Sequence, residues 1–212
     1  MFFVFFLTLP FILNAQTPST SKVFVDERDK NAYPIVEIGG QTWLAADLRY
    51  ISPKAHYQDK VAAAKGNFYY WEEADEVCPA GWRLTSKDDW TNFCLDIVHK
   101  VAQTSPNLSS VFEVFSFNTI NQLALIFKQE TQLDFLGEHT LLNIIPVGRI
   151  EDGVADPSTT YIDYWTTGIG TRFPYYHIHI SNNILQGHSH KHHVSKQSKK
   201  RRLFRVRCVQ VE

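Results

Sequence analysis

The chain has 212 residues, of which 44% are hydrophobic, 20% charged and 14% aromatic, and this composition excludes a protein that is disordered throughout. The formal net charge of −1 hides an asymmetry, because residues 1–170 carry 12 basic and 21 acidic side chains, a balance of −9, whereas residues 171–211 carry 9 basic and no acidic ones. Any surface that attracts polyanions is therefore expected in the C-terminal fifth of the chain.

The N-terminus begins with an apolar run, MFFVFFLTLPFILNA, that ends in the small residue Ala15. This pattern is typical of a signal peptide and is too short for a membrane-spanning helix. No basic residue precedes the run, so an uncleaved anchor is the alternative, and no cysteine follows it as a lipoprotein anchor requires. We expect a signal peptide at 1–15, a short linker at 16–22, one domain at 23–212 and no spanning segment after cleavage.

Two elements are predicted in the first eighty residues. Tyr33–Leu44 places β-branched and aromatic residues on either side of two consecutive glycines, which predicts a β-hairpin. Residues 70–78 carry apolar side chains at spacings of three and four, with four acidic side chains opposite, which predicts a short amphipathic helix. Pro79 and Gly81 are expected to end it.

A second helix is expected directly afterwards. Thr85 or Ser86 can cap its N-terminus, and Asp88 and Asp89 lie in the first turn, where the helix dipole favours anions. Its apolar face comprises Trp90, Phe93, Cys94, Ile97, Val98 and Val101.

Strands are predicted at Tyr161–Thr167, Tyr175–Ile180 and Leu203–Val211. No firm assignment is made for residues 104–141. In the last strand one side carries apolar residues and the other two arginines, so we expect it to be half buried. The two sides are Phe204, Val206 and Cys208 against Arg205, Arg207 and Val209.

Several short blocks carry a family resemblance. They are Ile38–Ala45 with Asp47-Leu48, Trp71–Ala74, Cys78–Leu84, Trp90, Pro146–Arg149, Tyr164–Thr167 and Val206–Val209. Together they resemble the Fibrobacter succinogenes major paralogous domain, over about Val23 to Val209, and the block CPAGWRL is the most specific of them. The motif residues, for which the resemblance implies a structural role, are Gly39, Gly40, Trp43, Trp71, Ala74, Pro79, Gly81, Trp82, Arg83, Leu84, Trp90, Trp165 and Arg207.

The resemblance implies an α+β, C-type-lectin-like fold, with two short helices packed on small antiparallel sheets and with long loops. It also implies a disulfide between Cys78 and Cys208, which suits an exported chain because disulfides persist in oxidising compartments. Cys94 is then the odd thiol, expected to be a buried small hydrophobe and not a nucleophile. Formylglycine-generating enzymes share the lectin-like fold but need two accessible cysteines, which weakens an enzyme hypothesis.

The histidines suggest two further hypotheses. His177 and His179 alternate with isoleucines, so both imidazoles are expected on one side of a strand. Clustered imidazoles can chelate zinc or copper, although no cysteine or carboxylate lies nearby in the sequence and six Lys and Arg at 191–202 oppose a cation. The candidate ligands are His188, His190, His192 and His193. The same segment is otherwise a solvated loop, or a polyanion contact that gains charge below about pH 6.5, through Lys196, Lys199, Lys200, Arg201 and Arg202.

Calcium-dependent sugar binding finds little support. Neither the Glu-Pro-Asn nor the Trp-Asn-Asp triplet of sugar-binding C-type lectins occurs. Asp152, Asp156 and Asp163 are expected to be solvated acids and not calcium ligands. Core packing is expected for Trp82, Trp90 and Trp165, with sugar stacking as the alternative.

We therefore expect an extracellular or cell-surface binding module of a Bacteroidetes-type bacterium, with the periplasm as the alternative location. Its expected partner is an unidentified extracellular ligand, a glycan or another polyanion, and not a specific nucleic acid; no cofactor is expected. A redox or hydrolytic enzyme on the same scaffold and a secreted metal-binding protein are the alternatives. The oligomeric state is left open.

Overall fold

The structure is a computed structural model, and it combines two helices with three sheets in the part of the chain that it describes. Strand pairing there is antiparallel, except that β9 and β13 run parallel. The expected α+β class is therefore confirmed. The expected signal peptide lies outside the described residues, which are 22–53, 65–104, 112–117, 122–127, 142, 144–156, 158, 160–168, 175–181, 184–190 and 202–212.

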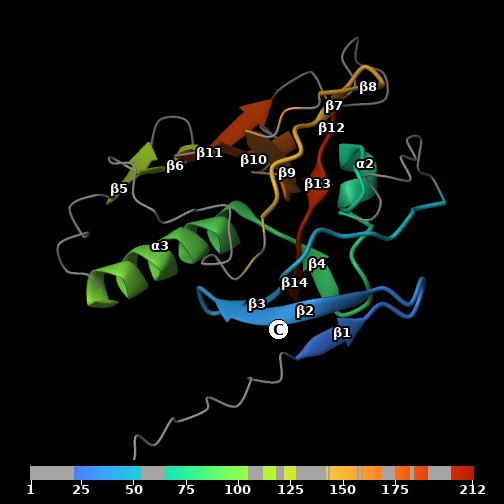
Figure 1. The fold of residues 1–212 in the computed structure, drawn as a ribbon, viewed down its shortest axis with the longest axis horizontal. Helices are drawn as coiled ribbons and strands as arrows, with labels where there is room; N and C mark the ends of the chain where they lie inside the picture. The colour runs from blue at the N-terminus through green and yellow to red at the C-terminus, as the bar shows by residue number, and fades with distance from the viewer. Residues whose placement is uncertain are drawn as a thin grey trace, which may run out of the picture.

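A five-stranded sheet is built around the predicted hairpin (Figure 1). Gly39 and Gly40 have φ of 62° and 76°, which lets two residues turn the chain between β2 and β3. The hairpin prediction is thus confirmed. The strands, in sheet order, are β1 (Val23–Val25), β2 (Ala32–Ile38), β3 (Gln41–Leu44), β14 (Cys208–Gln210) and β4 (Trp82–Leu84).

The second sheet has six strands, and a third sheet has three. Two strands of the second sheet, β5 and β6, lie in the stretch for which no prediction was made. Its order is β13 (Arg205–Val206), β9 (Tyr161–Thr166), β10 (Tyr175–Ser181), β11 (Ile184–His190), β6 (Gln122–Phe127) and β5 (Phe112–Phe117). The third sheet pairs β12 (Arg202–Leu203), β7 (Ile150–Glu151) and β8 (Val154–Ala155).

The first helix, α2 (Trp71–Ala74), is shorter than the predicted helix over 70–78. Glu73 was expected on its polar side, yet only 3% of this residue is exposed. Its carboxylate accepts a hydrogen bond from the backbone N–H of Tyr70 at 3.1 Å. A capping role at the N-terminus therefore decides the position of this acid, which a pattern of apolar spacing does not show.

The second helix, α3 (Lys87–Thr104), is the longer one, and Ser86 caps it. The Ser86 hydroxyl accepts from the Asp89 N–H at 3.1 Å, while the Asp89 carboxylate accepts from the Ser86 N–H at 2.6 Å. Within the described residues, no helix is both long and apolar enough to cross a membrane.

The core consists mainly of two apolar clusters. In Figure 1, α3 lies between the β2–β3 hairpin and the six-stranded sheet. It buries Trp90, Phe93 and Cys94 against Trp43 of β3 and against the inner side of β9, β10 and β11. The other cluster collects Trp165, Phe204 and Cys208 around α2 and β4.

The end of the chain passes through all three sheets. Residues 202–203, 205–206 and 208–210 form β12, β13 and β14, so the single strand predicted at Leu203–Val211 is three short ones. The prediction that this strand is only half buried is also wrong, because Arg205 is 1% and Arg207 0% exposed. The Arg207 guanidinium is instead paired inside the protein with Asp47, at 2.7 Å.

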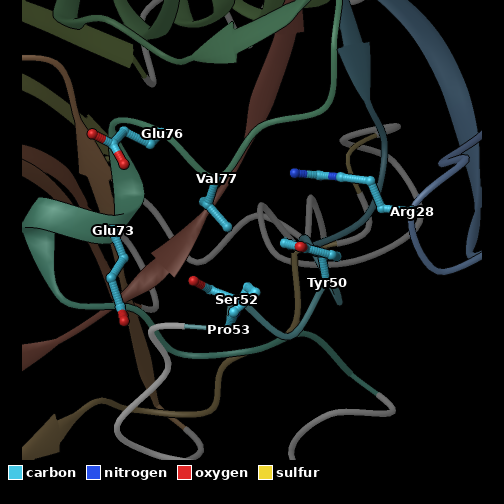
Figure 2. Close-up of a pocket in the computed structure, with 7 residues that line it drawn as sticks. All are labelled: Arg28, Tyr50, Ser52, Pro53, Glu73, Glu76 and Val77. Atoms are coloured by element: carbon cyan, nitrogen blue, oxygen red, sulfur yellow. The ribbon is translucent and has the colours of Figure 1, made fainter.

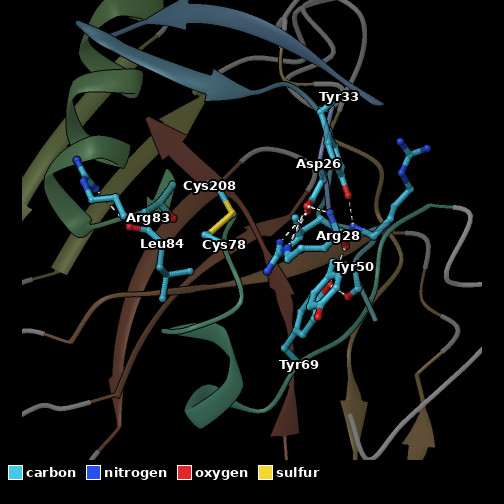
Figure 3. The surroundings of a disulfide bond; sticks show 12 residues. Asp26, Arg28, Tyr33, Tyr50, Tyr69, Cys78, Arg83, Leu84 and Cys208 are labelled. Carbon is cyan, nitrogen blue, oxygen red and sulfur yellow. Dashed lines mark hydrogen bonds and ion pairs between the residues drawn. A yellow bond between two sulfur atoms is a disulfide. The ribbon is translucent and has the colours of Figure 1, made fainter. Parts of the chain in front are cut away.

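Cys78 and Cys208 are joined in the structure, as the resemblance implies. Their sulfurs lie 2.07 Å apart and their Cα atoms 5.9 Å apart. Figure 3 shows this bond between the segment that follows α2 and the start of β14. It closes 130 residues of sequence.

Candidate functional site

The face of the six-stranded sheet that points away from α3 carries the histidines. Along β10, Tyr176, Ile178 and Ile180 point into the core, and the residues between them point to the opposite face. His177 pairs directly with His188 of β11, and His179 pairs with Gln186. Directly paired residues of antiparallel strands share a face, so β10 and β11 present these polar side chains together. The prediction that His177 and His179 lie on one side of a strand is confirmed.

One buried carboxylate lies beside the histidines, on the neighbouring strand. Asp163 of β9 is 0% exposed, and its Oδ1 atom lies 2.8 Å from Nδ1 of His179 and 3.6 Å from Nε2 of His177. The His177 ring stacks on the His188 ring with centroids 5.3 Å apart, and the His179 and His188 centroids are 6.0 Å apart. Asp163 therefore orients the His179 ring by a hydrogen bond to its Nδ1 atom. The other nitrogen of the His179 ring, Nε2, takes no part in that hydrogen bond.

Two arginines lie beside these histidines: Arg149, which directly precedes β7, and Arg202 of β12. Arg149 Nη1 lies 3.5 Å from Asp163 Oδ2, and its Nε lies 3.3 Å from Glu151 Oε2. Arg202 is paired directly with Glu151 in the register of β12 and β7, with Nη2 3.5 Å from Oε1. Both guanidinium groups thus contact Glu151 at distances longer than a good charge-assisted hydrogen bond.

These side chains surround an open cavity of about 290 Å³. We call it the histidine pocket, and it is lined by Arg149, His177, His179, Gln186, His188 and Arg202. Its lining offers guanidinium, amide and imidazole donors, with Asp163 as the buried carboxylate behind them. This donor set fits a negatively charged or strongly polar group.

The electrostatics of the pocket depend on His188. Burial in the pocket wall lowers the pKa of His188 below its ordinary value, the charge of His179 lowers it further, and Asp163 acts in the opposite direction. His188 is consequently neutral at neutral pH, and protonation adds positive charge to the lining in acidic solution.

The metal hypothesis is only partly covered by the structure. His192 and His193 lie outside the described residues, and only the backbone of His190 is described, as part of β11. His188 and His190 belong to a strand and not to the loop in which they were expected. Within the described ranges, no three His, Cys, Asp or Glu side chains are placed to hold a metal ion.

The polyanion hypothesis is covered at one residue. Arg202 lines the histidine pocket, whereas Lys196, Lys199, Lys200 and Arg201 lie outside the described residues. The expectation that Asp163 is solvated is wrong, because strand pairing places it under His179. No carboxylate lies near the clustered histidines in the sequence. In the fold, however, the pairing of β9 with β10 brings Asp163 and the histidines together.

Sequence reasoning missed Arg149 and Gln186 as pocket residues. Gln186 is two residues before His188 and hence on the same face of a strand, a signal that was present. Arg149 was quoted only as part of a family block. The preceding residue, Gly148, forms a bridge to Ile162 of β9, and the sequence carries no local signal for this long-range contact.

Four of the five motif tryptophans are buried in the core. Trp43, Trp90 and Trp165 are fully buried and Trp82 nearly so, which leaves them no free face on which a sugar can stack. Trp90 donates a hydrogen bond from Nε1 to Thr85 at 3.0 Å, and Trp165 donates one to the Tyr69 carbonyl at 2.7 Å. The core-packing interpretation is thus the one that the structure supports.

A second cavity, of about 210 Å³, lies beside α2 (Figure 2). Arg28 lies 3.8 Å above the Tyr50 ring on one side, and Glu73 and Glu76 line the other. Asp26 pairs with the Arg28 guanidinium at 2.7 Å. The lining therefore presents no excess of positive charge and does not suit a polyanion.

Cys94 is buried in the core of α3 and the two large sheets. Burial raises the pKa of its thiol, so the thiolate that a nucleophile needs is disfavoured. This environment matches the expectation of a small hydrophobe.

The comparisons with known proteins give one match. A family model described as the Fibrobacter succinogenes major domain matches residues 36–210, which is most of the chain. No curated protein matches the chain. No solved structure matches it either.

Proposed function

The chain belongs to the Fibrobacter succinogenes major domain family, and from this premise we propose that it is an exported or cell-surface binding module whose ligand is an acidic glycan. The histidine pocket is the proposed binding site. We further propose that the α+β scaffold is C-type-lectin-like, with the Cys78–Cys208 disulfide fixing its last strand and with loops free to vary.

The observation that carries this proposal is the composition of the histidine pocket. Arg149, Arg202 and Gln186 supply donors, and three imidazoles add charge when they are protonated. Arg202 of this lining is also the last residue of the basic stretch of the sequence.

Export is supported by two independent features. The first fifteen residues have the pattern of a signal peptide, and the fold contains a disulfide that closes a long stretch of sequence. Disulfides of this kind persist in oxidising compartments and are rare in reducing ones.

A glycan array at two salt concentrations tests the proposal. The full mature protein is applied in about 0.1 M and about 1 M NaCl, where the Debye length falls from about 10 Å to about 3 Å. We expect acidic glycans to be retained at the lower concentration and lost or much weakened at the higher one. Failure to bind any acidic glycan at either concentration would refute the proposal.

A matched pair of variants locates the site. Arg149→Gln with Arg202→Gln removes two positive charges from the pocket, and Lys22→Gln with Lys87→Gln removes two positive charges outside it. Only the first variant is expected to lose binding. Equal losses would show that general charge, and not the histidine pocket, retains the glycan.

A hydrolytic enzyme is the second candidate, and one observation favours it. The hydrogen bond between His179 and Asp163 would hold the imidazole in the orientation that a general base needs. Incubation of the bound glycans with the protein, followed by mass spectrometry of the products, separates the two candidates. Cleavage that disappears in His179→Gln would favour the enzyme, and intact glycans would favour the binding module.

A further inference from the structure

We propose that the histidine pocket receives one compact oxyanion, a carboxylate or a sulfate group, between the guanidinium groups of Arg149 and Arg202, and that Glu151 competes with the ligand for these two groups. The inference deepens the proposed function and rests on it, because the oxyanion is taken to be a side group of the acidic glycan.

The pocket is small for a ligand site. A volume of about 290 Å³ is at the lower end of ligand sites. It accommodates one anionic group with part of the sugar that carries it, and not several residues of a polymer. The rest of a long ligand must lie outside the pocket.

The two arginines are held in place by the fold. Arg202 is fixed by the β12–β7 register, and Arg149 is held by Asp163 at 3.5 Å and lies over the Tyr161 ring at 5.6 Å. The Arg149 side chain therefore has supporting contacts besides Glu151, and strand pairing fixes the backbone of Arg202. Pre-positioned guanidinium groups recognise carboxylate and sulfate oxygens with a small loss of conformational entropy.

Glu151 contacts both of these arginines. Its two carboxylate oxygens lie 3.3 Å from Arg149 and 3.5 Å from Arg202, although Glu151 is not part of the pocket lining. One carboxylate of the protein thus already bridges the two guanidinium groups that a ligand would use. Its side chain is 26% exposed, and ion pairs of this length and exposure are weak. A ligand oxyanion can therefore take over these contacts.

The lining of the pocket determines the sign of the charge that it can bind. Arg149 and Arg202 are part of this lining, and among the described side chains no set of three His, Cys, Asp or Glu can hold a metal ion. A divalent cation would be repelled by the same two guanidinium groups that attract an oxyanion. The arrangement thus favours an anion over zinc or copper.

Isothermal titration calorimetry of the full mature protein tests the inference, with sodium sulfate and sodium glucuronate as separate probes. The wild-type protein is expected to bind at least one of them with saturable heat. Binding of glucuronate alone assigns a carboxylate, and binding of sulfate alone assigns a sulfate ester. If neither probe binds while acidic glycans are still retained on the array, the inference fails and the proposed function stands. If the array is negative as well, both fail.

The competition has its own pair of variants. Glu151→Gln frees the two guanidinium groups and is expected to tighten binding by about two- to fivefold, the range of a weak ion pair. Asp152→Asn makes the same charge change at the next residue, in the turn between β7 and β8, and is expected to leave affinity within about twofold of wild type. Weaker binding in Glu151→Gln, or equal tightening in both variants, would overturn the role of Glu151.

The guanidinium groups are tested singly. Arg149→Gln and Arg202→Gln are each expected to weaken probe binding by at least about tenfold, as expected for loss of a charge-assisted contact. Circular dichroism confirms that each variant is folded, and Arg149→Lys is a second variant that keeps the charge. Zinc chloride is the last probe. Saturable zinc binding that is lost in His188→Gln would identify a metal site and overturn the inference.

Discussion

The guanidinium of Arg207 lies 2.7 Å from the carboxylate of Asp47, and both side chains are buried. Asp47 also accepts a hydrogen bond from the Tyr164 hydroxyl at 2.8 Å, and Arg207 donates one to the Leu44 carbonyl at 3.2 Å. The pair therefore ties the C-terminal segment to the chain after β3 and to β9. The pairing explains why an arginine between β13 and β14 is tolerated in the interior.

We expect Arg207→Met to destabilise the protein by about 3 kcal/mol or more, because it leaves the Asp47 carboxylate buried without its counter-charge. Lys30→Met is the control, since the Lys30–Glu27 pair is exposed and should contribute less than about 1 kcal/mol. Urea unfolding of both variants gives the comparison. A double variant, Arg207→Met with Asp47→Leu, should recover part of the loss. Equal stabilities of the two single variants would contradict this account.

The disulfide should be a large contributor to stability. Replacing Cys78 and Cys208 together by serine is expected to lower the free energy of unfolding by up to about 5 kcal/mol in the chain-entropy model. Denaturant unfolding of the oxidised protein and of the double variant measures the difference. Mass spectrometry after alkylation provides the chemical check: in the native, non-reduced protein Cys78 should not react. Alkylation of Cys78 under these conditions would show that the bond is absent.

The two hairpin glycines should differ in their response to substitution. Both have positive φ, so alanine at either position is strained by about 1 kcal/mol. At Gly39 an added Cβ would also lie 2.6–2.8 Å from backbone atoms of Asn92 and Phe93 in α3, whereas at Gly40 nothing lies within 4 Å. Gly39→Ala should therefore destabilise by on the order of 3 kcal/mol and Gly40→Ala by about 1 kcal/mol. Thermal unfolding of the two variants checks the ranking, which a reversed order would refute.

The pH dependence of stability should reveal His188. Because the pKa of His188 is lower in the folded protein than its ordinary value of about 6.5, the unfolded chain binds more protons and stability rises with pH. Its contribution is full above about pH 6.5 and is lost as the pH falls through the folded pKa. His188→Gln should flatten the fall in melting temperature below about pH 6.5. An unchanged profile in His188→Gln would contradict the prediction.

The parts of the fold that local patterns determine could be predicted. The β2–β3 hairpin follows from two glycines between apolar stretches, and the face shared by His177 and His179 follows from the alternation of a strand. Cap residues are equally local, since Ser86 and Asp89 are three residues apart.

The parts that depend on distant pairing could not. Arg207 is buried because Asp47, far away in the sequence, neutralises it, and a pattern of alternating residues gives no sign of such a partner. The pocket depends on Asp163 of β9 and Arg149 before β7, which reach the histidines only through sheet register. The histidines could be recognised from the sequence as candidate site residues. Asp163 and Arg149, which are distant from them in the sequence, complete the pocket.

The path of residues 202–210 has a consequence for the order of folding. This segment contributes one strand to each of the three sheets and one cysteine to the disulfide. A chain that emerges from a ribosome or a translocation channel N-terminus first therefore lacks a seam common to all its sheets until residue 210 has appeared. We therefore expect the three sheets to be joined only after these residues have emerged.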